Sequence, residues 1–73
     1  MMQYYRIYVR LKSGGQATGR ELHTGPPPDR GTVLEVPLVS GRSVKVRIGA
    51  SHTEKAAGKQ RGSSVTEVYA DEI

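Results

Sequence analysis

The sequence predicts an all-β fold: a small antiparallel roll or barrel of about five strands with at most one short helical turn. Apolar residues alternate with polar ones in several segments, and this period of two is typical of half-buried strands. Glycine and proline separate these segments, and no segment carries a sustained apolar helical face. The length of 73 residues predicts a single small domain, and because the sequence contains no cysteine we expect its core to hold without disulfide bonds.

The first predicted strand, in which apolar residues alternate from Tyr5 onward, has two faces of different polarity. Its apolar face, expected in the core, consists of Tyr5, Ile7, Val9 and Leu11. Its other face carries Tyr4, Arg6, Tyr8, Arg10 and Lys12. A second, weaker strand is expected over residues 17–23. A two-residue turn at residues 14–15 would oppose its Leu22 to Ile7.

Two further strands are expected after a proline-rich loop over residues 24–31, where three prolines exclude a helix and a central strand. The strand over residues 32–39 turns Leu34, Val36 and Leu38 to the core, and its Pro37 indicates a sheet edge or a bulge. The next strand places the side chains of Val44, Val46 and Ile48 in the core. A three-residue turn at residues 40–42 opposes Val36 to Val46, so that apolar residues face each other.

The rest of the chain divides into a loop and a closing strand. Residues 49–62 are small, polar and basic, which predicts a flexible loop. Capping-box spacing between Ser51 and Glu54 allows one helical turn over residues 54–57 instead. Residues 63–73 are rich in strand-forming side chains and predict a closing strand, with a helix as the alternative.

One stretch of this pattern is similar to a known kind of domain. Residues 31–38, a Ser40-Gly41-Arg42 turn and residues 44–48 follow a proline-bearing loop. This order resembles small Src-homology-type β-barrel proteins of unknown function, found as short bacterial proteins. The resemblance covers roughly residues 31–48 and 68–73, and it implies the barrel fold without any activity or site residue.

The candidate site is a basic and aromatic face. Lys and Arg outnumber Asp and Glu by 11 to 7, which gives a formal net charge of +4. Bases stack on tyrosine rings while arginine and lysine meet phosphates, so this face predicts binding of single-stranded nucleic acid or another polyanion. Its residues are Tyr4, Arg6, Tyr8, Arg10 and Lys12 of the first strand, extended by Lys45 and Arg47.

Two other interpretations compete with nucleic-acid binding. A strand face rich in Arg and Tyr is also what a solvated sheet surface looks like, and the acidic Glu67, Asp71 and Glu72 could neutralise it. Alternatively, the chain is a protein-interaction or homo-oligomeric module that adds a partner strand at an exposed edge near Pro37 or the second strand.

Enzyme, metal and membrane functions lack a matching motif. His52 and Glu54 match half of a zinc-deaminase signature, but its other half needs cysteines that this chain does not have. We therefore expect no enzyme, no metal site and no cofactor. No stretch approaches the roughly 20 apolar residues of a membrane span. The start also lacks a secretory signal, so we expect a cytoplasmic protein.

Overall fold

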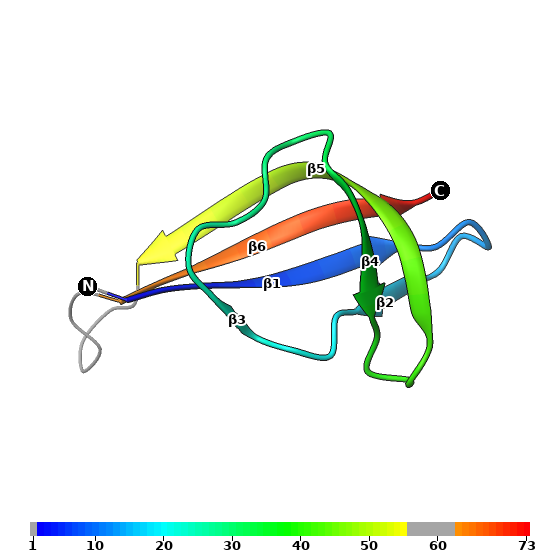
Figure 1. The fold of residues 1–73 in the computed structure, drawn as a ribbon, viewed down its shortest axis with the longest axis horizontal. Helices are drawn as coiled ribbons and strands as arrows, with labels where there is room; N and C mark the ends of the chain where they lie inside the picture. Colours follow the sequence, from blue (N-terminus) through cyan, green and yellow to red (C-terminus); the bar gives the residue numbers. More distant parts are fainter. Residues whose placement is uncertain (1, 56–62) are drawn as a thin grey trace.

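The computed structural model describes residues 2–55 and 63–73, and in this part of the chain it contains strands and no helix. The strands are β1 (Met2–Arg10), β2 (Gln16–Thr18), β3 (His23–Thr24), β4 (Val33–Pro37), β5 (Ser43–Lys55) and β6 (Ser63–Glu72). They form one strongly curled sheet, a half-barrel in which β4 and the first half of β5 cross over β1 and β2 (Figure 1). The predicted all-β fold is confirmed.

The sheet is mixed, because its central pair is parallel. The strand order is β2-β1-β6-β5-β4, with β3 pairing beside β2 on β1. β6 runs parallel to β1, from Met2 opposite Ser63 to Arg10 opposite Asp71, whereas the other pairs are antiparallel. The sequence predicted antiparallel pairing throughout. A parallel pair needs a long crossover connection, and here the crossover is the whole of β2 to β5.

The two outer strands of the sheet meet at one end and nearly close the barrel. The Arg20 N–H donates to the Pro37 carbonyl at 2.8 Å, and the Val39 N–H donates to the Thr18 carbonyl at 3.0 Å. Gly19 forms a β-bridge with Leu38 between these two bonds. The expected edges at Pro37 and at the second strand are therefore bonded to each other, which hides backbone groups that an open sheet exposes.

The core lies on the concave side of the sheet, where every long strand contributes its apolar face. The buried hydrophobic residues are Ile7, Val9, Val36, Leu38, Val44, Val46, Ile48, Val68 and Ala70. Tyr5, Leu11, Ala17 and Leu34 pack against them from the rim. Each buried Val, Leu or Ile contributes about 1.5–3 kcal/mol relative to an exposed position. The inward phases predicted for the first strand and for both strands of the β4–β5 hairpin are confirmed.

The β1–β2 and β4–β5 hairpins use the same three-residue turn, which ends in a glycine with positive φ. In the β1–β2 turn, Gly14 (φ 99°) donates its N–H to the Leu11 carbonyl at 2.9 Å. In the β4–β5 turn, Gly41 (φ 96°) donates its N–H to the Leu38 carbonyl, also at 2.9 Å. Three-residue hairpin loops typically end in a left-handed residue, a position that glycine occupies without steric cost.

The position of the left-handed glycine overturns both predicted registers. In the first hairpin the loop is residues 12–14, Tyr8 opposes Thr18, and Leu22 is 48% exposed instead of facing Ile7. In the second hairpin the loop has the predicted length but covers residues 39–41, so Val36 opposes Val44. Glycine must stand third in this turn, and the predicted loops placed Gly14 first and Gly41 second.

The segment expected as a basic loop is partly a strand. β5 continues past Ile48 to Lys55 because β6 pairs along it, with a bulge between Ile48 and Ser51. The loop prediction is therefore wrong for residues 49–55, and so is the helical alternative at residues 54–55. Residues 56–62 lie outside the described part of the chain. The predicted closing strand is confirmed as β6.

Among the glycines in the described residues, Gly19 is the one where an added Cβ would come closest to another atom. A Cβ there would lie 2.8 Å from the Ile7 carbonyl oxygen, which accepts the Gly19 N–H at 2.7 Å. We expect Gly19→Ala to lower the free energy of unfolding by about 1–3 kcal/mol, because backbone must move. Urea denaturation measures this loss. Gly15→Ala is the control, since its Cβ would meet only Leu11 Cδ1 at 3.9 Å. Equal losses in the two variants would refute the steric argument.

Candidate functional site

The convex face of the sheet carries the outward side chains of β1, β6 and β5 in cross-strand rows. Paired residues project to the same side, so the strand register fixes which side chains are neighbours. Three rows follow one another along the strands. They are a glutamate row (Arg6, Glu67 and His52), a tyrosine row (Tyr8 and Tyr69) and an arginine row (Arg10, Asp71 and Arg47). Successive rows are about 6.6 Å apart, since each step is two strand residues.

The basic stripe that the sequence predicted on β1 alternates in space with carboxylates of β6. Arg6 opposes Glu67, and Arg10 opposes Asp71, with Arg10 Nε 3.8 Å from Asp71 Oδ1. The Arg10 and Asp71 side chains are 77% and 66% exposed, so this ion pair is solvated. The face is therefore a mixture of both charges instead of a continuous cationic strip.

The remaining predicted site residues lie at different places. Tyr4 opposes Val65 at the start of the sheet, and Lys45 opposes Glu35 of β4. Lys12 lies in the β1–β2 turn, where its backbone N–H donates to Glu72 Oε1 at 3.0 Å. Of the seven predicted residues, the structure thus brings Arg6, Tyr8, Arg10 and Arg47 into the three adjacent rows and leaves Tyr4, Lys12 and Lys45 outside them.

The tyrosine row forms an aromatic surface in the middle of the convex face. The rings of Tyr8 and Tyr69 stack with their centroids 5.9 Å apart and their planes 29° apart. The Tyr69 hydroxyl donates a hydrogen bond to Glu67 Oε2, two residues earlier on β6. Tyr69 is 43% exposed, so the surface is open to solvent and to a flat ligand.

A groove of about 480 Å³ runs beside these rings. Its polar, charged and aromatic lining residues are Tyr8, Arg10, Gln16, Arg30, Glu67, Tyr69 and Asp71, and Gly49 and Ala50 also line it. Gly49 and Ala50 belong to the β5 bulge, which sets these two small residues beside Tyr69. A side chain at position 49 would come within 3.2 Å of the Tyr69 carbonyl oxygen. The groove is hollow here because the bulged strand presents almost no side chain.

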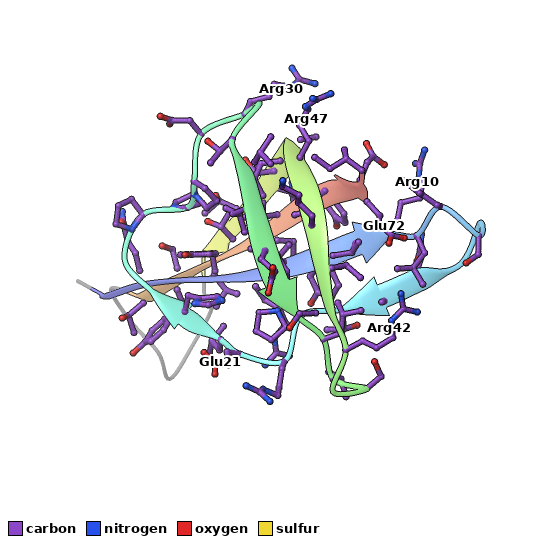
Figure 2. The ribbon with its side chains drawn as sticks, turned by 45° about the vertical axis from the view of Figure 1, so that its right-hand side comes forward. Arg10, Glu21, Arg30, Arg42, Arg47 and Glu72 are labelled. Carbon is purple, nitrogen blue, oxygen red and sulfur yellow. The ribbon has the colours of Figure 1, made fainter. Side chains whose placement is uncertain are left out.

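Positive charge gathers at the arginine end of the groove. Arg30 reaches it from the end of the proline-rich loop, where the neighbouring Gly31 N–H donates to the Ile48 carbonyl at 2.8 Å. Figure 2 shows Arg30 and Arg47 at the same end of the curled sheet, with Arg42 toward its other end. Arg10 pairs with Asp71, Arg47 opposes Asp71 on β5, and Arg30 lines the same groove. This excess of arginine over carboxylate favours an anion.

The groove includes charged and aromatic residues that were not among the predicted site residues, namely Arg30, Glu67, Tyr69 and Asp71. Glu67 and Tyr69 share the outward phase of β6 with Asp71, against the buried Thr66, Val68 and Ala70. That alternation is visible in the sequence and could have identified them. Arg30 has no such signal, because the fold of the proline-rich loop brings it to the groove.

Comparisons with protein-family models, with curated proteins and with solved structures find no match for this chain. In the described residues, no three His, Asp or Glu side chains gather as ligands for a metal ion. The same part of the chain contains no helix of the length and hydrophobicity needed to cross a membrane.

The Arg10–Asp71 pair is expected to add little to stability. A double-mutant cycle with Arg10→Gln and Asp71→Asn should give a coupling energy of about 0–1 kcal/mol, because exposed ion pairs are screened by water and salt. Thermal or urea unfolding of the four proteins measures it. A coupling above about 2 kcal/mol would mean that the pair is a structural support, and Arg10 would then be a poor candidate for ligand binding.

Proposed function

We propose that the chain is a small non-enzymatic binding module whose groove binds single-stranded nucleic acid. The observation that carries the proposal is the stacked Tyr8–Tyr69 pair with Arg10 and Arg30 along the same groove. Proteins that hold single strands combine aromatic stacking surfaces with cations that meet the phosphates. We expect this function in the cytoplasm, and we regard the half-barrel as a variant of the small Src-homology-type barrels.

The ligand contacts follow from the order of the rows. A base stacks on the exposed side of Tyr69, above the hollow at Gly49 and Ala50. Its phosphates lie one row further along, where arginines outnumber carboxylates. Arginine suits this position because its planar guanidinium group binds phosphate in a bidentate manner and keeps its charge.

The proposed binding surface is smaller than the sequence suggested. Arg6 has Glu67 as its cross-strand neighbour, and Lys45 has Glu35. The arginines near the groove are Arg10, Arg30 and Arg47, with Asp71 among them. Binding of this kind has a modest electrostatic component and depends on stacking for much of its affinity.

The protein-interaction alternative has less support at the edges first considered. The Pro37 and Thr18 carbonyls both accept hydrogen bonds from within the chain, so a partner strand cannot pair with them there. β4 still ends the strand order, and its outward groups over residues 33–36 are where a strand could add. Light scattering of the pure protein distinguishes a monomer from a self-associating module.

Removing the aromatic surface should abolish most of the affinity. We expect Tyr69→Ala to weaken binding by about 1–3 kcal/mol, roughly 5- to 150-fold, because a base loses its stacking partner. Fluorescence anisotropy with a labelled thymine heptamer at about 50 mM salt measures this. Tyr69→Phe should retain the affinity within a few-fold. Val65→Ala, also outward on β6 but outside the groove, is the control. If the wild-type protein does not bind, the proposal is wrong.

The salt dependence of the binding affinity should report how many arginines contact phosphate groups. Three contacts predict a slope of about −2 for log affinity against log salt, taking roughly 0.7 per contact with a single strand. Arg10→Gln and Arg30→Gln should each reduce the slope by about 0.7. Arg42→Gln removes the same charge just before β5, outside the groove lining, and should leave the slope unchanged. Equal effects of all three substitutions would indicate attraction by net charge instead of by the groove.

A further inference from the structure

We infer that the groove prefers guanine over the other bases, with the Glu67 carboxylate accepting hydrogen bonds from the guanine Watson–Crick edge. The inference rests on the proposed function, because it concerns the same groove, and it adds the identity of the base. It starts from the position of Glu67 beside the aromatic surface.

Glu67 and Tyr69 are on the same side of β6, and the Tyr69 hydroxyl donates to Glu67 Oε2. This bond fixes the carboxylate at the hydroxyl end of the ring on which a base would stack. Both residues also line the groove. A base on Tyr69 therefore has a carboxylate at one edge, on the side away from the arginine row.

The carboxylate keeps the capacity to bind a ligand. Each carboxylate oxygen accepts two hydrogen bonds, so Oε1 and the second lone pair of Oε2 remain for a base. Both groove carboxylates have basic cross-strand neighbours, Arg6 and His52 for Glu67 and Arg10 and Arg47 for Asp71. They differ in their contacts, because Asp71 forms an ion pair with Arg10 at 3.8 Å, whereas Glu67 accepts its hydrogen bond from the Tyr69 hydroxyl. Glu67 is thus the acceptor for a base, whereas the charge of Asp71 is offset by its arginine neighbours.

Only one of the common bases presents two adjacent donors to such an acceptor. Guanine offers N1–H and the N2 amino group side by side. Adenine and cytosine each offer an amino group next to a ring nitrogen that accepts, and thymine and uracil offer one N–H between two carbonyls. Against these bases, one carboxylate oxygen would face another acceptor and make no hydrogen bond. Such an unpaired acceptor costs binding free energy when the contact is desolvated. A bidentate carboxylate contact therefore selects guanine.

The order of the glutamate, tyrosine and arginine rows matches the order of chemical groups in a guanine nucleotide. The Watson–Crick edge of guanine is opposite the side that carries the sugar. With that edge at the glutamate row and the ring on the tyrosine row, the sugar and phosphate point to the arginine row. The groups on the three rows thus match the base edge, the base face and the phosphate in sequence, with Arg10 and Arg30 near the phosphate.

The test uses the full chain and thymine heptamers with one central substitution by guanine, inosine, adenine or cytosine. We expect the guanine heptamer to bind about tenfold more tightly than the adenine or cytosine heptamers, the size of one good bidentate contact. Inosine keeps N1–H but lacks the N2 amino group, so the inosine heptamer should lose most of the tenfold gain in affinity. This comparison tests the contact in the wild-type protein, without any substitution in the chain.

The matched variants are Glu67→Gln and Asp71→Asn, which remove the same charge from the same strand. Glu67→Gln should bind the four heptamers with nearly equal affinity, because its amide presents a donor where guanine needs an acceptor. Asp71→Asn should bind all of them more tightly and keep the guanine preference. Thermal unfolding confirms that both variants are folded.

The possible outcomes separate this inference from the proposed function. Equal affinities for the four heptamers, still weakened by Tyr69→Ala, would overturn the guanine preference and leave nucleic-acid binding standing. A guanine preference that survives in Glu67→Gln would assign the selection to another group and overturn the role of Glu67. Failure of the wild-type protein to bind any heptamer would overturn both proposals.

Discussion

The parallel pairing of β1 with β6 is the constraint on which both the core and the groove depend. It sets Val68 opposite Ile7 on the concave side and Tyr69 opposite Tyr8 on the convex side. Side chains alternate along each strand, so a shift of one residue in β6 would expose Val68 and turn Tyr69 inward. The energy of burying the apolar residues thus also fixes the neighbours of each groove residue. The functional face is specified by the core behind it.

The sequence was a good guide to strand faces and a poor guide to strand partners. Alternation identifies Ile7 and Val46 as buried because each strand's period is a local property. Register depends on turn geometry, and the two hairpins were mispredicted because the left-handed glycine stands third in each loop. The parallel pair could not be predicted at all, since nothing local links residues 2–10 to residues 63–72. Strand formation over residues 49–55 likewise requires the partner strand β6.

The same limit explains what the sequence missed in the candidate site. Read along β1, the outward residues look like an uninterrupted basic and aromatic stripe. Once β6 lies beside it, each of Arg6 and Arg10 has a carboxylate neighbour, and a second tyrosine joins the first. Charge that would attract any polyanion is thereby reduced, and a stacking surface with a distinct anionic side and cationic side takes its place. In such an arrangement, selectivity depends on the order of the acidic, aromatic and basic side chains along the face more than on the net charge of the face.

The β5 bulge connects the shape of the sheet to the shape of the groove. A bulge increases local twist and bends its strand, and here it lies where β5 leaves β4 and continues alone beside β6. The residues at the bend are Gly49 and Ala50, and their small size leaves the space beside Tyr69 unfilled. Gly49 is also close to the Tyr69 carbonyl, so a larger residue there would move the strand that carries the ring. The irregularity that lets the sheet curl around its core is therefore the one that gives the convex face a groove.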